Sequence, residues 1–453
     1  MASDTTTEFE ETTTGSIDTP FAGLSSPELK SHTPSHGVLG KTLRWIKLDG
    51  LVILFDQGCC SITTFLCGVF VARACSKDEY ALYVLGFTLL MVVQLVQHSI
   101  VSIPFTVHSP QMDLARSASY FGSKVIHQAT LSTVTIAGLV GTAVLLHMIR
   151  LNSHMTGMLL GLSVGVFGLL MRDFMRYILL ARLQIWSSLL MGLMANFATL
   201  IGLYWAYSSG RLSAAFAYII VGFSSALPAM LAVISRRREV MIQRSQVVRD
   251  LKRDWRFGRW LLISYVANSF GVQSMPWLLL LFYGSESVAI MGVLIAITGF
   301  IRPIVIGADA YLVPKLANRL KDGGLRSATK AGTVAFAAMG GAMLAYVLSM
   351  ALWGEALVGV FYTERYQGHA GSLVFMAVAM GLIGTNIPLR ALLRVTNRPK
   401  AESFASVCGS LVMILAGLSL VPWCGILGAS IAISIGNLAF VCINKLAISR
   451  VTK

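Results

Sequence analysis

Ionisable side chains that interrupt long apolar stretches are the residues of this chain best suited to chemistry. A charge at the centre of a bilayer costs about 2.5 to 3.5 kcal/mol on insertion scales, so each should face protein or a water-filled cavity. The positions are Asp56, Arg172, Asp173, Arg176, Arg302, Asp309, Arg390 and Arg394. Arginine outnumbers aspartate in this set, and its planar guanidinium suits bidentate contacts to phosphate. We therefore expect the interior to bind an anionic ligand.

Spacing along the chain limits which of these charges can neutralise one another. Arg172 and Arg176 lie one helical turn apart, and Asp173 can compensate only one of them. Arg302 and Asp309 are about 10.5 Å apart along a helix axis, so each needs another partner. The alternative for the arginines is that their side chains extend to the lipid headgroups.

Polar side chains at helical spacing extend the candidate site over three apolar stretches. Those that share a face are Asp56, Cys60, Thr63, Thr64 and Cys67, then Gln94, His98 and Ser102, then Ser264, Asn268 and Gly271. We expect the three stretches to line a common cavity, although ordinary packing through small polar side chains gives the same pattern. His98 would act as a proton relay or as a neutral, hydrogen-bonded ring.

The elements that must position these residues are membrane-spanning helices. Hydrophobic residues make up 55% and charged residues 13% of the chain, which excludes a water-soluble globule. A helix needs about 20 apolar residues to cross the hydrocarbon. That length predicts an all-α polytopic membrane protein with twelve spans, at 49–72, 80–107, 124–148, 155–181, 186–208, 213–234, 258–283, 286–310, 328–353, 369–393, 402–422 and 424–447. The fourth span is the least apolar, and we keep it because the alternation of charge requires it.

Lysine and arginine alternate from one side of the predicted membrane to the other. Of 36 such residues, 31 lie in the N-terminal approach, the loops after even-numbered spans and the C-terminus. Because positive residues near short spans stay on the cytoplasmic side, we expect a multi-pass protein of the cytoplasmic (inner) membrane with both termini cytoplasmic. The net charge of +15 then faces anionic membrane lipids, and we expect no nucleic-acid partner.

The longest connection between spans divides them six and six. We expect a disordered, acidic, Ser/Thr-rich cytoplasmic tail at 1–40, an N-terminal six-helix lobe at 41–234, a basic cytoplasmic linker at 235–257 and a C-terminal six-helix lobe at 258–453, with a central cavity between the lobes. The turns at 76–81 and 284–288 resemble each other, and Pro104 and Pro303 lie in the spans after them. The tail lacks the pattern of a signal peptide, so deleting residues 1–35 should leave insertion unchanged.

Neither metal-ligand spacing nor a catalytic motif is present. The seven cysteines lie within or beside apolar stretches and the eight histidines are scattered, so we expect buried thiols and no metal. Every predicted outward loop is short and has no domain that could carry the carboxylates of a glycan-building enzyme. We expect a protein without enzymatic activity and without a cofactor.

One stretch of sequence resembles a known family. Asp56-Gln57, Gly68 to Ala74 and then Asp78-Glu79-Tyr80-Ala81-Leu82-Tyr83 are similar to the first two spans of polysaccharide transporters in the multidrug/oligosaccharidyl-lipid/polysaccharide flippase superfamily. That family commonly has Leu-Gly where this chain has Cys75-Ser76, and glycine where it has Ala81. The twelve-span layout extends the resemblance over residues 45–448.

The resemblance implies a flippase that moves a polyprenyl-pyrophosphate-linked oligosaccharide to the outer leaflet during O-antigen, capsule or exopolysaccharide assembly. It also implies alternating access coupled to an ion gradient, and contact with a polysaccharide polymerase or other assembly proteins. Position makes Asp56 and then Asp309 the candidates for proton or sodium coupling. Arg302, Arg172 and Arg176 are candidates for the pyrophosphate, and the remaining candidates, for the sugar or lipid path, are Gln94, His98 and Asn268.

Four other interpretations are alternatives to this one. A lipid-linked peptidoglycan precursor flippase shares the cargo chemistry, but that group resembles a fourteen-span design and this sequence predicts twelve spans. A drug and toxin extruder of the same superfamily should hold acidic groups for cationic cargo, against which the arginine excess counts. A non-transporting scaffold of a glycan assembly complex would tolerate Arg302→Ala or Asp56→Ala. A membrane glycosyltransferase or polymerase would transfer sugar when purified.

Overall fold

The computed structural model describes residues 36–109, 112–150, 153–396 and 398–450, and every regular element in these ranges is helical. The predictions for the tail before residue 36 lie outside the described residues. The chain divides into two units, Met1–Leu48 and Asp49–Lys453. The first contributes only the helical start of α1 to the described part, and the second contains the rest of α1 and all the other described helices.

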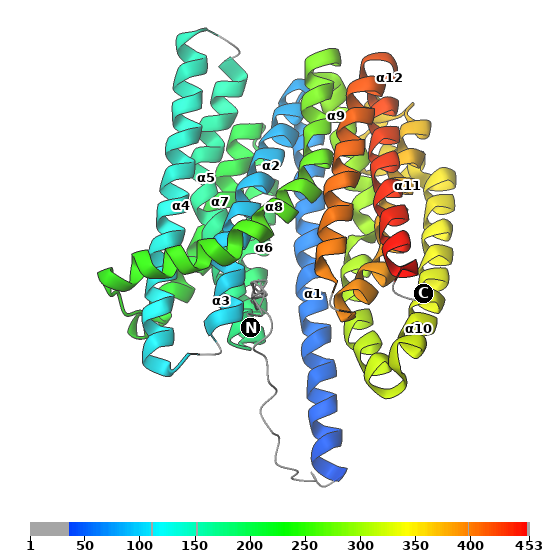
Figure 1. Ribbon diagram of the computed structural model, residues 1–453. Coiled ribbons are helices and arrows are strands. Elements are labelled where there is room, and N and C mark those ends of the chain that lie inside the picture. Colours follow the sequence, from blue (N-terminus) through cyan, green and yellow to red (C-terminus); the bar gives the residue numbers. More distant parts are fainter. Residues whose placement is uncertain (1–35, 110–111, 151–152, 397, 451–453) are drawn as a thin grey trace, which may run out of the picture. The chain divides into compact units, whose positions relative to one another are not determined.

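The first half of the chain forms α1 to α7 (Figure 1). Their bounds are α1 His36–Ala74, α2 Lys77–Gln97, α3 Ile103–His108, α4 Leu114–Met148, α5 Ser153–Ala181, α6 Ile185–Ser208 and α7 Ala214–Ser235. The α5 and α7 helices approach so closely that a Cβ at Gly168 would lie 1.9 Å from the carbonyl oxygen of Gly222. Glycine at such a crossing lets membrane helices pack backbone against backbone.

The second half forms α8 to α12. Their bounds are α8 Arg244–Tyr283, α9 Ser285–Thr298, α10 Arg302–Tyr362, α11 Ala370–Val395 and α12 Pro399–Ser449, with 3₁₀ turns at Arg237–Glu239, Gly299–Ile301 and Glu364–Tyr366. Backbone breaks divide two of these helices. Gly323 and Gly324 interrupt α10, and Gly425 interrupts α12. Gly324 and Gly425 have φ of 65° and 55°, a region that glycine enters without steric cost.

The fold class predicted from the sequence is confirmed. Within the described ranges, nine helical stretches are long and apolar enough to cross a membrane. Two of them, Ser285–Tyr362 and Lys400–Ser449, contain the internal breaks. The predicted span at 258–283 lies in the second half of α8, which is helical to Tyr283 but is not among these nine stretches. The protein is an all-α bundle of twelve spans in two lobes, and α5 is the fourth span that the charge pattern required. The lobe and linker boundaries stay predictions.

The two spans that contain Pro104 and Pro303 are both broken. A five-residue π-helix, His98–Ser102, separates α2 from α3 just before Pro104. The 3₁₀ turn Gly299–Ile301 separates α9 from α10 just before Pro303. A proline lacks the donor that an α-helix needs, so the backbone before it changes its hydrogen-bond pattern.

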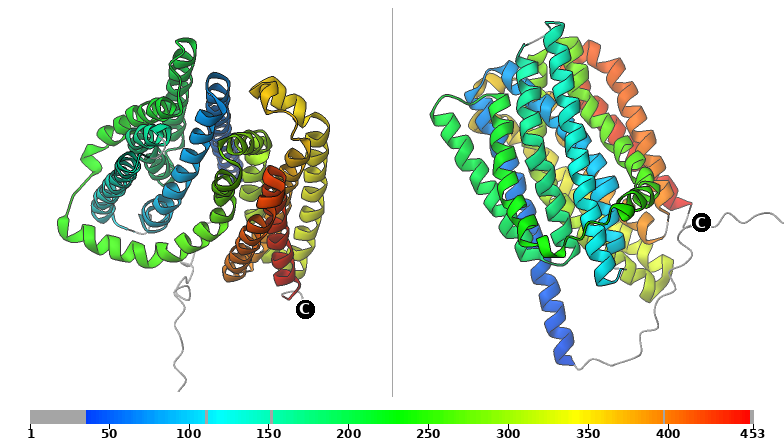
Figure 2. Two further views of the ribbon diagram at one scale, coloured as in Figure 1. Left: turned by 90° about the horizontal axis from the view of Figure 1, so that it is seen from above. Right: turned by 90° about the vertical axis from the view of Figure 1, so that its left-hand side faces the viewer.

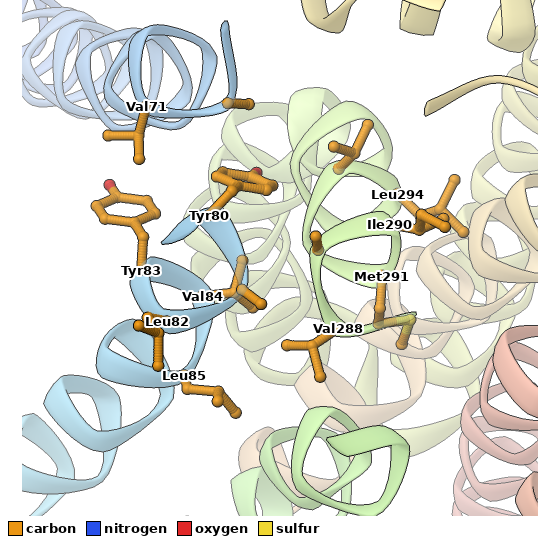
Figure 3. Packing of buried hydrophobic residues seen from close by; sticks show 14 of the residues in the cluster. Val71, Tyr80, Leu82, Tyr83, Val84, Leu85, Val288, Ile290, Met291 and Leu294 are labelled. Atoms are coloured by element: carbon orange, nitrogen blue, oxygen red, sulfur yellow. The ribbon is translucent and has the colours of Figure 1, made fainter. Parts of the chain in front are cut away.

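The helices α2 and α9 join the two halves of the chain through an apolar contact (Figure 3). Tyr80 and Val84 of α2 and Val288 of α9 lie between the two helices, all within one buried cluster. A Cβ at Gly292 would lie 2.2 Å from Val84, so the helices touch where α9 has no side chain. The two resembling turns lie at the end of this contact, where Lys77 pairs with Glu286 and Ser285 hydrogen-bonds Asp78.

The region predicted as a linker includes the helical start of α8, which crosses α4 (Figures 1 and 2). Lys124 of α4 pairs with Asp254 at 2.9 Å, and both side chains are fully buried. Tyr120 donates to the same carboxylate at 2.9 Å. Arg116 pairs with Asp250 one turn earlier. The start of α8 is therefore held against α4 by buried ion pairs rather than extended in solvent.

Candidate functional site

A group of ionisable and polar side chains from α1, α2 and α5 forms the candidate site, which we call the N-lobe cluster. It contains most of the residues proposed from the sequence: Asp56, Gln94, His98, Arg172, Asp173 and Arg176. Each lies within a stretch long and apolar enough to cross a membrane, where an ionised group is costly unless it is paired or solvated. The three helices bring together residues that are up to 120 positions apart in sequence.

Arg176 of α5 is paired with α1. Its guanidinium donates to Asp56 Oδ2 through Nε at 3.0 Å and lies 2.8 Å from the same oxygen through Nη2. It also donates to Gln57 Oε1 at 3.0 Å. Asp56 Oδ1 is buried and has no hydrogen-bond partner among the described residues. A Cβ at Gly192 of α6 would lie 2.6 Å from that oxygen. The carboxylate therefore fits beside α6 only because residue 192 has no side chain.

The side chains next to Asp173 come from α2 and from the π-helix that follows it, and neither neighbouring arginine donates a hydrogen bond to it within the described ranges. Its Oδ2 accepts from Gln94 Nε2 at 3.1 Å and lies 3.3 Å from His98 Nε2. His98 begins the π-helix, and its ring centroid lies 4.8 Å from that of Tyr177. The sequence expectation that Asp173 compensates an adjacent arginine is incomplete, because its hydrogen bonds go to the polar stripe of α2.

Arg172 is the unpaired cation of the cluster. Its closest hydrogen-bonding atoms are Ser225 Oγ at 3.5 Å and Cys60 Sγ at 3.9 Å, both weak neutral partners. No carboxylate of the described residues forms an ion pair with it. Asp56 is paired with Arg176, and Asp173 is hydrogen-bonded to Gln94 and lies beside His98. Arg172 therefore has no direct ion-pair partner in the cluster, although the two arginines and two aspartates balance in formal charge.

Arg302, in the second half of the chain, resembles Arg172 in having no carboxylate partner among the described residues. It begins α10, directly after the 3₁₀ turn, and its side chain is exposed. Within the described part of the chain, it has neither an ion pair nor a hydrogen bond. Tyr346 lies near it and donates its hydroxyl to Thr298 O at 2.8 Å. Arg302 and Asp309 do not pair, as their spacing predicts.

Asp309 belongs to a second charged group, formed by α10, α11 and α12. Arg394 donates to Asp309 at 3.0 and 3.3 Å and to both oxygens of Glu402 at 2.9 and 3.1 Å. Arg390 donates to Glu402 at 2.7 Å. Neither arginine simply extends to the headgroups. Sequence reasoning missed Glu402 because it lies at the first residue of a predicted span, where a charge is ordinary.

The common cavity predicted from three polar stripes stays a prediction. The stripes of the first and second spans meet through α5, and Asn196 of α6 donates to Cys60 Sγ at 3.7 Å. The side chain of Asn268 lies outside the described part of the structure. The described residues hold no group of three or more His, Cys, Asp or Glu side chains that could bind a metal ion.

Comparison with known proteins identifies the fold. A multidrug resistance MATE-family transporter of the MOP superfamily, in an inward-facing conformation, has a TM-score of 0.72 at 16% identity, over 86% of this chain and 95% of its own. The lipid II flippase MurJ, in an inward closed conformation, has a TM-score of 0.70 at 13% identity, over 89% of this chain and 87% of its own. The chain has the MOP-superfamily fold.

A third MOP-superfamily structure comes from Pyrococcus furiosus. It has a TM-score of 0.62 at 13% identity, over 89% of this chain and 95% of its own. The reversed polarity of its binding pocket suggests that this transporter has a different function. No protein-family model and no curated protein matches the sequence. The superfamily named from the Asp56 to Tyr83 region is thus the one with this fold.

Proposed function

We propose that this MOP-fold protein flips a polyprenyl-pyrophosphate-linked oligosaccharide across the cytoplasmic membrane for surface polysaccharide synthesis. The observation that carries the proposal is the pair of intramembrane cations, Arg172 and Arg302, that have no carboxylate partner among the described residues. An unpaired cation at membrane depth is costly unless an anion or water compensates it. A pyrophosphate supplies that anion, with oxygens that suit the guanidinium fork.

Asp56 would couple this binding to an ion gradient. In the structure its carboxylate holds Arg176, so a pyrophosphate arriving beside Arg172 would compete for the same guanidinium. Release of Arg176 leaves Asp56 free to take a proton or a sodium ion. Return of the ion to solvent restores the pair and weakens substrate binding. Asp309 and Arg394 would repeat this exchange in the second lobe.

Alternating access would require the ends of the helices opposite the basic loops to separate. Arg73, at the end of α1, donates to the carbonyl oxygens of Val360 and Phe361 at the end of α10. Arg365 donates in return to the carbonyl oxygens of Ala72 and Cys75. Cations at helix C-termini are favourable, so this reciprocal contact, which we call the arginine exchange, would hold that side closed.

Two other functions are alternatives to this proposal. A multidrug exporter would need acidic groups free for cationic cargo, whereas Asp56 and Asp309 are both paired with arginine. A scaffold that binds a polymerase or other assembly proteins would use the basic surface near residues 235–257 and would not depend on either unpaired arginine. The orientation, with both termini cytoplasmic, rests on the charge pattern.

The deciding experiment measures flipping of a fluorescent polyprenyl-pyrophosphate oligosaccharide in liposomes, under an imposed proton or sodium gradient. Arg172→Ala and Arg302→Ala should each abolish gradient-dependent flipping. Arg319→Ala, which removes an exposed cation from the same helix as Arg302, should leave flipping unchanged. No flipping by folded, correctly oriented protein would refute the proposal. Flipping that survives both substitutions would show that these arginines do not bind the cargo.

A further inference from the structure

An apolar groove runs between the second half of α8 and the first half of α12. Its volume is about 440 Å³, within the range of ligand pockets. The lining residues are Leu262, Ile263, Val266, Ala267, Phe270, Val407, Ser410, Leu411 and Ile414. The sequence predicts a span over residues 258–283 of α8, and α12 is long and apolar enough to cross a membrane, so this groove suits a hydrocarbon chain.

Cations lie at one end of the groove on both helices. Residues seven positions apart lie on nearly the same helical face, about 10.5 Å apart along the axis. Arg256 lies seven residues before Ile263 on α8, and Lys252 lies one turn earlier. Lys400 lies seven residues before Val407 on α12. All three cations are exposed, so a positive rim marks the end of the groove nearest the basic loops.

The acidic residues of the same segments do not neutralise this rim. Asp250 and Asp254 of α8 are buried against α4, where Arg116 and Lys124 pair with them. Glu402 of α12 is held by arginines of α11. The three rim cations are thus available to an external anion.

The residues around the rim are typical of the membrane interface. Trp255, Leu251 and Val248 are exposed on the start of α8, with fractional exposures of 47%, 41% and 57%. Exposed apolar side chains beside Lys and Arg characterise helices that lie at the headgroup level, and tryptophan is enriched there. The rim is therefore expected at the depth of lipid phosphates, with the groove at the depth of acyl chains.

We propose that this groove binds one anionic glycerophospholipid of the leaflet on the basic side. Its phosphate contacts Lys252, Arg256 and Lys400, and one acyl chain lies between α8 and α12. The groove is too small to enclose a long polyprenyl chain, which favours a phospholipid over the lipid-linked oligosaccharide. This site lies on helices other than those of the N-lobe cluster and does not depend on transport.

The test uses purified full-length protein in phosphatidylcholine liposomes that contain a trace of photoreactive lipid. The probes are phosphatidylglycerol and phosphatidylcholine with the same diazirine-bearing acyl chain, and labelled peptides are mapped by mass spectrometry. We expect phosphatidylglycerol to label residues 262–270 and 407–414 preferentially. Since each cation near an anionic lipid contributes about 1 kcal/mol, Arg256→Gln and Lys400→Gln should each reduce labelling about fivefold.

Matched variants separate a specific site from bulk lipid contact. Ala267→Phe fills the groove and should abolish labelling there, while Ile201→Trp, on an exposed face of α6, should not change it. Arg319→Gln controls for the loss of one exposed cation. Equal labelling by both probes, or labelling insensitive to Arg256→Gln and Lys400→Gln, would overturn the proposal. Displacement of the probe by trace lipid-linked oligosaccharide would assign the groove to that lipid instead.

Discussion

Arg176 and Asp56 form a two-nitrogen contact between α5 and α1, with both distances at or below 3.0 Å. Arg172, one turn earlier on α5, has hydrogen-bond contacts to Ser225 and Cys60 and forms no ion pair within the described ranges. Two arginines of one helix therefore differ in what their charge does. Arg176 compensates a buried carboxylate, whereas Arg172 has only neutral hydrogen-bond partners among the described residues, as the proposed binding of an anion requires.

This difference predicts that removing the two arginines lowers stability by unequal amounts. Arg176→Leu should reduce the free energy of unfolding by about 3 to 5 kcal/mol, because it leaves Asp56 buried and unpaired. Arg172→Leu should change it by less than about 1 kcal/mol, because no carboxylate loses a partner. Thermal unfolding in one detergent compares the two. The double variant Asp56→Leu/Arg176→Leu should recover much of the loss, and equal destabilisation by both single arginine variants would contradict the assignment.

The space beside Asp56 gives a second prediction. Gly192→Ala places a methyl group 2.6 Å from Asp56 Oδ1, closer than real Cβ contacts allow. The carboxylate must shift and its contact with Arg176 must lengthen, so we expect a lower unfolding temperature and weaker flipping. Gly138→Ala is the control, because a Cβ there meets nothing within 4 Å. That change should be neutral or stabilise by up to about 1 kcal/mol.

Much of the architecture can be predicted from the sequence because hydropathy and charge are local signals. A run of about 20 apolar residues must form a helix in lipid, since no water is present to pair the backbone. The fourth span shows why charge placement adds to hydropathy. Arg172, Asp173 and Arg176 lower its apolarity, yet α5 is continuous over Ser153–Ala181.

Pairing within the site is less predictable from the sequence. The excess of arginine was predictable by counting, but a pairing between helices depends on their rotation and depth. Asp173 therefore contacts His98 rather than its neighbour Arg176, and Asp309 contacts Arg394 rather than Arg302. Asp250 and Asp254 appeared as part of a basic linker because burial against α4 has no signature in a charge count.

The arginine exchange predicts the accessibility of Cys75. This thiol is buried and contacts Leu212 O at 3.3 Å, and its pKa is raised to about 11, chiefly by burial and then by Glu79. Maleimide should label it slowly at neutral pH, and faster as the pH rises toward 11 and more thiolate forms.

Arg365→Ala should increase labelling of Cys75 at neutral pH, because it frees the carbonyl oxygens of Ala72 and Cys75 and lets the helix ends separate. Peptide mapping distinguishes Cys75 from the other six cysteines. Arg211→Ala, which removes an exposed arginine of the same side, is the control. Unchanged labelling in Arg365→Ala would show that the exchange does not keep this side closed.

The pair between Lys124 and Asp254 predicts that α8 depends on α4 for its position. Both side chains are fully buried, so Asp254→Leu leaves the Lys124 charge without its ion-pair partner and should cost about 3 to 5 kcal/mol. Lys124→Met should cost less, because Arg253 still lies 3.4 Å from the Asp254 carboxylate. The double variant should regain much of that stability, since an apolar pair can replace a buried ion pair.

Limited proteolysis tests the position of α8 separately from the stability of the protein. Cleavage after Arg249 or Lys252 should rise in each single variant and return toward the natural level in the double variant. Arg244→Met, which removes an exposed cation at the start of α8, should not change cleavage at these sites. If both single variants resist protease as well as the natural chain does, α8 is held by its apolar contacts and not by this pair.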